Sequence, residues 1–261
     1  MGVRFSQGPQ LLPLQIVAHR GAPDPAPENT IPSFERAIEL GADAVELDVR
    51  LTSDRVPVVH HYLYLGQATD ASGPIFERTF AQLRDVQVLC PVPNSSTDYR
   101  IPSLDEVLTT IGGRIGLEIE IKGPEAESAE IVGTVLCRFR HLWESIEVTS
   151  YEPALLLAVG ERCPGVAMDL LFPRSEDWMG LDVVAYLAGH RGRLAHARAV
   201  HLNPGQLSLD VVSAVRRQGI EVHAWGVNDR QALRMAVELK VPRVCTDRLR
   251  QALQFREGLL S

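Results

Sequence analysis

The sequence has few cysteines, and none of them is paired at a spacing that indicates a disulfide framework or a zinc site. No Cys-x-x-Cys motif occurs among the 261 residues. The wide spacing is typical of ordinary thiols in a reducing compartment. The four cysteines are Cys90, Cys137, Cys163 and Cys245.

Long apolar runs are also missing. No stretch approaches the roughly 20 apolar residues that a membrane-spanning helix needs. The first residues lack the apolar core and the small-residue cleavage site of a signal peptide. We therefore expect a cytoplasmic protein with no stable membrane insertion.

An excess of positive charge is absent as well. The 26 Lys and Arg residues against 33 Asp and Glu residues give a net charge of −7, which argues against a general nucleic-acid binder. Apolar residues make up 45% and charged residues 23% of the chain, as in ordinary soluble proteins. The length suits one large domain, which we expect over residues 1–261.

Short β-rich runs alternate with helical patterns along the chain. Such alternation is compatible with an eight-stranded β/α barrel or a doubly wound sheet, and the count of eight favours the TIM (β/α)8 barrel. The expected strands are Gln15–His19, Ala44–Arg50, Arg114–Lys122, Ile146–Ser150, Val166–Leu171, Ala199–Leu202, Glu221–Trp225 and Arg243–Thr246. The expected helices are Ile31–Leu40, Ser103–Thr110, Ala126–Phe139, Pro153–Val159, Leu181–Ala188, Leu207–Arg217, Asp229–Leu239 and Arg248–Phe255, with Gly41, Gly160 and Gly219 as expected helix C-caps.

One segment, from about residue 62 to 101, interrupts this alternation. It is rich in Gly, Pro, Ser, Thr and Asp. We interpret it as a small insertion after the second strand. Active sites of such barrels lie at the C-terminal ends of the strands, so the insertion is expected to overhang the site and to help select the substrate.

Acidic residues alternate with apolar ones in two of the expected strands. Glu46 and Asp48 alternate with Val45, Leu47 and Val49, so the acids share one face of the strand. Two acids that point into a barrel repel each other unless a cation neutralises them. The alternative is a half-exposed strand with polar residues facing water.

The second such strand contains Glu118, Glu120 and Lys122 on one face. These three residues could form a self-neutralised structural network. They could equally supply a third metal ligand and an ammonium group for a phosphate. An all-oxygen set suits a hard cation such as Ca²⁺ or Mg²⁺ better than zinc.

His19 and Arg20 end the first expected strand and precede Gly21. Histidine moves protons near neutral pH, and arginine can hold a phosphate in bidentate fashion. A His-Arg pair at the C-terminal end of a barrel strand therefore indicates a functional site more than a surface pair.

These residues belong to an ordered set of motifs that resembles the glycerophosphodiester phosphodiesterase family. The resemblance runs from about residue 16 to 249. It is carried by His19-Arg20-Gly21, Pro27-Glu28-Asn29-Thr30, Glu46-Leu47-Asp48-Val49, Thr52-x-Asp54, Pro57-Val58-Val59-x-His61, Ile101-Pro102-Ser103-Leu104, Glu120-Ile121-Lys122, Trp225-x-Val227-Asn228 and Thr246-Asp247.

The resemblance implies a TIM barrel and a metal-dependent hydrolysis of glycerophosphodiesters to glycerol 3-phosphate and an alcohol. It implies His19 and His61 as the general acid/base pair, and a small-molecule substrate with water or its own glycerol hydroxyl as the nucleophile. It implies phosphate contacts from Arg20 and Lys122, a pocket lining from Trp225, and a Ca²⁺ or Mg²⁺ ion on Glu46, Asp48 and Glu120.

The chain departs from the family pattern near its two adjacent histidines. Spacing from Pro57 favours His61 over His60 as the catalytic residue, and Tyr62 replaces the usual aspartate. Glu118 replaces the usual asparagine and is either a further ligand or a partner of one. The remaining histidines are interpreted as surface or packing residues, with His201 and His223, near expected strands, as the two candidates to face the pocket. Trp143 and Trp178 are interpreted as packing residues.

Two other functions stay open. A lysophospholipase D acting on lysophospholipids is expected to have an apolar rim, for which the insertion offers Tyr62, Leu63, Tyr64, Leu65, Ile75 and Phe76. A binding module that has lost activity through the changes around residues 62–68 is the other possibility.

Overall fold

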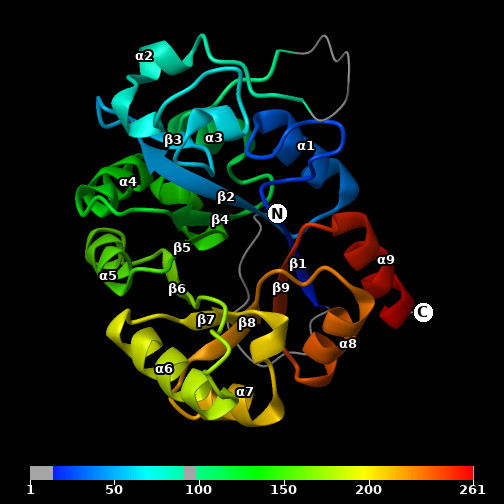
Figure 1. The fold of residues 1–261 in the computed structure, drawn as a ribbon. Coiled ribbons are helices and arrows are strands. Elements are labelled where there is room, and N and C mark those ends of the chain that lie inside the picture. The colour runs from blue at the N-terminus through cyan, green and yellow to red at the C-terminus, as the bar shows by residue number, and fades with distance from the viewer. Residues whose placement is uncertain (1–13, 91–97, 261) are drawn as a thin grey trace.

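The computed structural model describes residues 14–90 and 98–260, and the segment searched for a signal peptide lies largely outside them. Eight parallel strands form one closed barrel in the order β1-β9-β8-β7-β6-β5-β4-β2, and pairing of β1 with β2 closes the ring. This confirms the predicted TIM barrel (Figure 1). The strands are β1 (Gln15–Ala18), β2 (Ala44–Leu51), β4 (Gly116–Ile121), β5 (Ile146–Ser150), β6 (Ala167–Leu171), β7 (Ala199–Leu202), β8 (Glu221–Ala224) and β9 (Arg243–Thr246).

Helices surround this ring of strands (Figure 1). They are α1 (Ile31–Leu40), α3 (Leu104–Ile111), α4 (Glu127–Arg138), α5 (Pro153–Arg162), α6 (Leu181–Leu194), α7 (Leu209–Arg216), α8 (Arg230–Glu238) and α9 (Leu249–Leu260). Short 3-10 turns occur at η3 (Arg140–Ser145) and η4 (Pro204–Gln206). Within the described residues, no helix is long and apolar enough to cross a membrane.

Most residues predicted to begin or end a helix do so in the structure. Ser103 caps α3 and Glu106 completes the capping box, as the sequence indicates. Gly41 ends α1 in the left-handed conformation, with φ 85°. The prediction for Gly160 was wrong, because this residue lies inside α5, which continues to Arg162. Without a Pro or a left-handed Gly at that point, nothing local stops the helix.

The strands of the barrel bury both of their faces. Val45, Leu47 and Val49 of β2 belong to the apolar core between the strands and the helices. The alternate residues Glu46 and Asp48 are buried as well, although they are ionic. Inner barrel positions are thus shielded from water, and this excludes the half-exposed strand as an interpretation of the alternation.

A short strand, β3 (Pro57–Val59), pairs antiparallel with β2 and leads into the segment before α3. This segment contains η1 (Leu65–Gln67), η2 (Ile75–Glu77) and α2 (Phe80–Leu83). It has a small apolar core of its own, which includes Leu65, Ile75, Leu83, Val88 and Tyr99. In Figure 1 the segment lies in cyan beside β3 and α3.

Candidate active site

The loop after β1 has a backbone that fixes His19 and Arg20 at the mouth of the barrel. Arg20 adopts a left-handed conformation with φ 55°, and Gly21 follows with φ 91°. A Cβ atom at Gly21 would lie 2.5 Å from Oγ of Ser33 and 2.8 Å from its carbonyl carbon. Glycine is therefore required here both for its conformation and for the close approach of α1.

Three carboxylates of two neighbouring strands converge at this mouth. Oxygen atoms of Glu46, Asp48 and Glu120 lie within 4.8 Å of one another, and all three residues are buried. Burial, together with repulsion from the other two acids, raises the pKa of Glu46 well above its usual range. Oε1 of Glu46 makes no hydrogen bond. The three predicted ligands thus form one all-oxygen cluster that could hold a divalent cation.

Two basic side chains neutralise part of this acidic charge. Nζ of Lys122 lies 2.9 Å from Oδ1 of Asp48 and 2.8 Å from Oε1 of Glu120. Nε of Arg20 lies 3.1 Å from Oδ2 of Asp48, and its Nη1 donates to Glu28 at 2.9 Å. Burial opposes ionisation of Asp48, but its hydrogen-bonded and cationic neighbours outweigh burial and lower its pKa well below the usual range.

The two adjacent histidines have different environments. Nδ1 of His61 lies 3.2 Å from Oδ2 of Asp48, and its Nε2 lies 3.3 Å from Nη2 of Arg20. His60 is buried away from this group, and burial lowers its pKa to about 4. Since β3 ends at Val59, strand register alone does not determine which of the two histidines faces the carboxylates. The structure places His61 there.

A second carboxylate contacts the other predicted catalytic histidine. Nδ1 of His19 contacts Oδ1 of Asp247, and Asn228 donates from its amide to Oδ2 of the same aspartate. The hydrogen bond to His19 lowers the pKa of Asp247 to about 2. Asp247 and Asn228 belong to motifs that carried the resemblance, but the sequence alone assigned no role to either residue.

Asn29 is another residue to which the sequence assigned no role. Its amide donates to Oδ2 of Asp48 at 2.7 Å, and its Oδ1 accepts from the backbone amide of Asp48 at 3.2 Å. This pair of bonds fixes the Asp48 carboxylate. The Pro-Glu-Asn-Thr motif was the available signal, since both Glu28 and Asn29 contact the site.

Trp225 lies half-buried at the C-terminal end of β8. Its ring nitrogen donates to the carbonyl of Phe172 at 3.1 Å, and the guanidinium of Arg174 stands over its ring at 5.3 Å. Tyr151 is also close to the acidic cluster. Burial, with repulsion from Glu120, raises the pKa of Tyr151 to about 12, and sequence reasoning did not identify this residue.

Two of the other histidines do not behave as surface residues. His201 and His223 are buried inside the barrel, where both contact Asp169. Nδ1 of His201 lies 3.5 Å from Glu118. Neither histidine lies on the surface, and Glu118 is not one of the three converging carboxylates. His141, His190 and His196 are exposed, as expected.

The two remaining tryptophans differ from each other. Trp143 is buried and donates to the carbonyl of Leu136, which confirms its packing role. The prediction for Trp178 was wrong, because 68% of its surface is exposed. The expected apolar rim is smaller than predicted, since Leu65 and Ile75 are fully buried in the core of the insertion.

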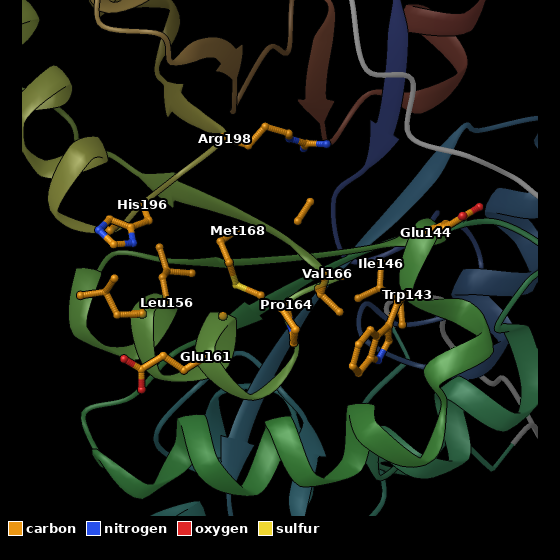
Figure 2. A pocket seen from close by; sticks show the side chains of 15 residues that line it. Trp143, Glu144, Ile146, Leu156, Glu161, Pro164, Val166, Met168, His196 and Arg198 are labelled. Carbon is orange, nitrogen blue, oxygen red and sulfur yellow. The ribbon is translucent and has the colours of Figure 1, made fainter.

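A cavity of about 950 Å³ lies at the opposite end of the barrel, beside the start of β5 and β6. Figure 2 shows Trp143, Met168, His196 and Arg198 among the side chains that line it. None of the three converging carboxylates lines this cavity, so its size alone does not identify it as the functional site. That site is defined by its charged groups.

Comparison with known proteins gives one consistent result. A model of the glycerophosphoryl diester phosphodiesterase family matches residues 19–251. A glycerophosphodiester phosphodiesterase of Caldanaerobacter subterraneus is 28% identical over 243 residues, which cover 89% of this chain and 93% of the relative. Mouse glycerophosphodiester phosphodiesterase 1 is 32% identical over 249 residues, which cover 82% of this chain and 72% of the relative.

Solved structures have the same fold. The glycerophosphodiester phosphodiesterase of Agrobacterium tumefaciens superposes with a TM-score of 0.75 at 25% identity, covering 92% of this chain and 99% of that one. An Oleispira antarctica phosphodiesterase, solved with its product sn-glycerol-3-phosphate, gives a TM-score of 0.80 at 24% identity and covers 93% of this chain and 96% of that one.

Proposed function

The chain belongs to the glycerophosphoryl diester phosphodiesterase family, and from this membership we propose that it hydrolyses glycerophosphodiesters to glycerol 3-phosphate and an alcohol in a reaction that depends on a divalent cation. The observation that supports this most strongly is the meeting, at one barrel mouth, of three buried carboxylates, two basic side chains and two histidines that each contact a carboxylate.

The cation we propose is Ca²⁺ or Mg²⁺, held by Glu46, Asp48 and Glu120. The donor set is all oxygen, and the unpaired Oε1 of Glu46 gives one buried atom that no protein group satisfies. When bound, the cation would neutralise negative charge on the phosphoryl oxygens. It would also relieve the repulsion that raises the pKa of Glu46.

Arg20 and Lys122 would bind the phosphate. An ammonium has three N–H donors, and two of those of Lys122 face carboxylates. The third remains for a phosphoryl oxygen. The guanidinium of Arg20 has five N–H donors, of which three are taken by protein groups. Both side chains are thus oriented by the acids and still have donors for the substrate.

The two histidines would transfer the protons. The bond from Nδ1–H of His61 to Asp48 leaves Nε2 with a lone pair, which faces Nη2 of Arg20 at 3.3 Å and would turn to the nucleophile when Arg20 binds the phosphate, so His61 suits the general base. Burial lowers the pKa of His61, with Asp48 opposing, and a neutral imidazole is what a base requires. Asp247 contacts Nδ1 of His19 and orients its Nε2 towards the site, from which His19 would give a proton to the leaving alcohol as the general acid.

Lysophospholipids are a second candidate substrate class. Leu63 and Tyr64 lie two and three positions after His61 and are exposed by 36% and 56%. Such apolar side chains beside the site could contact an acyl chain. Replacing Tyr64 by Ser is expected to lower kcat/KM for a lysophospholipid and leave kcat/KM for glycerophosphocholine unchanged.

The test is turnover by purified protein loaded with Ca²⁺ or Mg²⁺. We expect release of glycerol 3-phosphate from glycerophosphocholine and related diesters, lost on addition of a chelator and restored by the cation. Asp48→Asn is the matched control, because it removes one carboxylate charge with little change in shape. Absence of turnover across several head groups and lysophospholipids would instead support a binding module on the same barrel.

A further inference from the structure

Four buried side chains meet inside the barrel, each at the second or third residue of its strand. Each comes from a different one of four consecutive strands: Glu147 of β5, Asp169 of β6, His201 of β7 and His223 of β8. None of them is more than 5% exposed. One ligand atom of each lies within 4.8 Å of those of the others. We call this group the lower cluster.

The shortest contacts in the lower cluster centre on two ring nitrogens. Nε2 of His201 lies 3.2 Å from Oδ2 of Asp169, 3.3 Å from Oε1 of Glu147 and 3.1 Å from Nδ1 of His223. Nδ1 of His223 lies 3.1 Å from the same Oδ2 of Asp169. The four atoms thus face a common centre.

Hydrogen bonds do not account for this convergence. Each ring nitrogen carries at most one hydrogen, so at most two of the four contacts can be hydrogen bonds. Oε1 of Glu147 is fully buried and makes no hydrogen bond. A carboxylate oxygen without a hydrogen bond in the interior is costly. This oxygen lies 3.3 Å from Nε2 of His201.

We propose that the lower cluster is a closed structural site for a divalent transition-metal ion of the zinc class. Zinc binds histidine nitrogen and carboxylate oxygen at about 2.0–2.1 Å in tetrahedral geometry. Two ligands of such a tetrahedron are about 3.3 Å apart, which matches four of the six separations in the lower cluster, at 3.1–3.3 Å, while all six lie within 4.8 Å. Two imidazoles and two carboxylates suit zinc better than Ca²⁺ or Mg²⁺.

The surroundings of the lower cluster are those of a metal site. Nδ1 of His201, the nitrogen that faces away from the centre, lies 3.5 Å from Glu118. Metal-binding histidines commonly direct their other nitrogen to a carboxylate, and here the contact is at ion-pair distance without a hydrogen bond. Glu118, which the sequence left without a clear role, is therefore a positioning residue for His201.

The two carboxylate ligands are held from outside by arginines. Arg198 and Arg243 contact Oε2 of Glu147, which leaves Oε1 facing the centre. Arg198 also donates to Asp169, whose Oδ1 accepts from the backbone amide of Ala199. These bonds fix both carboxylates before any ion arrives, and preorganisation of this kind favours binding.

A proton on His201 is the competing explanation. Burial would lower the pKa of His201, but Glu118 and the contacts with Asp169 and Glu147 raise it to about 10. With Arg198 and Arg243 each positive, one such proton balances the three carboxylates Glu118, Glu147 and Asp169. A divalent ion with neutral His201 would leave the same groups with one excess positive charge, so charge alone favours the proton. The case for an ion rests on geometry, because one proton leaves most of the four contacts unsatisfied.

The cavity at the lower end of the barrel provides a route for an ion. Arg198 lines that cavity (Figure 2) and also contacts Glu147 and Asp169, so it connects the cavity wall to the lower cluster. Movement of one partly exposed arginine would open the path. Because all four ligand positions are filled by protein, the role we infer is cross-linking of β5 to β8.

The first test locates the metal in the parent protein. The protein is expressed with zinc in the medium and dialysed against a chelator, which removes any cation from Glu46, Asp48 and Glu120. It is then crystallised. We expect about one zinc per chain by elemental analysis, and an anomalous peak at the zinc edge among the four ligand atoms. A map without that peak would overturn the proposal and assign the lower cluster to a proton-bound network.

The second test uses variants and Co²⁺ as a spectroscopic substitute for zinc. The parent is expected to show the intense visible absorption of tetrahedral Co²⁺, and His223→Gln is expected to lose it. His196→Gln, at an exposed histidine of the cavity, is the matched control and should retain it. Glu118→Gln should weaken zinc affinity by about 10–100-fold. Equal Co²⁺ spectra in parent and His223→Gln would contradict the proposal.

Discussion

The carboxylate of Asp247 contacts Nδ1 of His19, although 228 positions separate the two residues. The contact joins the end of β9 to the end of β1, which are neighbouring strands of the closed barrel. A carboxylate on Nδ1 sets both the tautomer and the direction of the opposite ring nitrogen. We therefore expect Asp247 to act as a positioning residue for His19.

Asp247→Asn should lower kcat by about 10²-fold, the lower part of the range for general acid–base catalysis. KM should change little, because the phosphate contacts come from other residues. Steady-state kinetics checks this. In a double variant with His19→Ala, the second change should cost almost nothing, since the two residues act as a unit. Additive losses would show that Asp247 acts independently of His19.

His61→Ala should reduce turnover by about 10²–10⁴-fold, as expected for loss of a general base. His60→Ala should leave most activity and mainly reduce stability, because His60 is buried and the contact with Asp48 is made by His61. Both variants are compared for kcat, metal affinity and Tm. A large catalytic loss confined to folded His60→Ala would show that the roles are exchanged.

Asp48→Asn should greatly weaken binding of Ca²⁺ and Mg²⁺, because one of three converging carboxylate charges is lost. Calorimetric titration of chelator-treated protein measures the affinity. Asp54→Asn is a suitable control, since Asp54 is outside the cluster and accepts from Thr52 and Phe80 instead. Equal affinity in the parent and Asp48→Asn would remove Asp48 from the metal site.

Stability should depend on pH through His60. Burial lowers its folded-state pKa from 6.5 to about 4, so the unfolded chain binds a proton more readily than the folded one. Neutral His60 therefore contributes stability above pH of about 6.5, and that contribution is lost as the pH falls towards about 4. Denaturation of the parent and His60→Gln across this window should show a smaller fall in the variant. Parallel curves would contradict the assignment.

Gly21→Ala should destabilise the protein by about 1–3 kcal/mol, because a side chain at φ 91° is strained and its Cβ overlaps Ser33. Gly41→Ala is the matched control. It has a similar φ of 85° but nothing within 4 Å of the new Cβ, so it isolates the conformational term. Chemical denaturation of both variants measures the difference. A loss in Gly21→Ala no larger than that in Gly41→Ala would show that the overlap is relieved at little cost.

The periodic features of the fold were predictable from the sequence, because they depend on local spacing. Alternation of acids and apolar residues in β2 and β4 places Glu46, Asp48 and Glu120 on the inner faces of adjacent strands. That placement follows from the two-residue period of a strand. The ordered motifs then indicated the family, and the eight strands follow the predicted order.

Features that depend on a single residue or on a loop were not predictable in this way. Gly160 continues a helix, Trp178 is exposed, and Leu65 and Ile75 enter the core of the insertion. Strand register also does not decide between His60 and His61, because both residues follow the last residue of β3; the preference for His61 came from its spacing from Pro57. Local sequence patterns carry no information on these points, because packing against distant segments decides them.

Closure of the barrel decided the rest. Arg243 and Cys245 of β9 and Asp247 just after it alternate along the chain. Arg243, at the start of the strand, contacts Glu147, and Asp247, after its end, contacts His19. The lower cluster likewise takes one residue from each of four strands, with no spacing motif in the sequence. The sequence determined which side chains face inward, and only the stagger of the closed strands determined which of them meet.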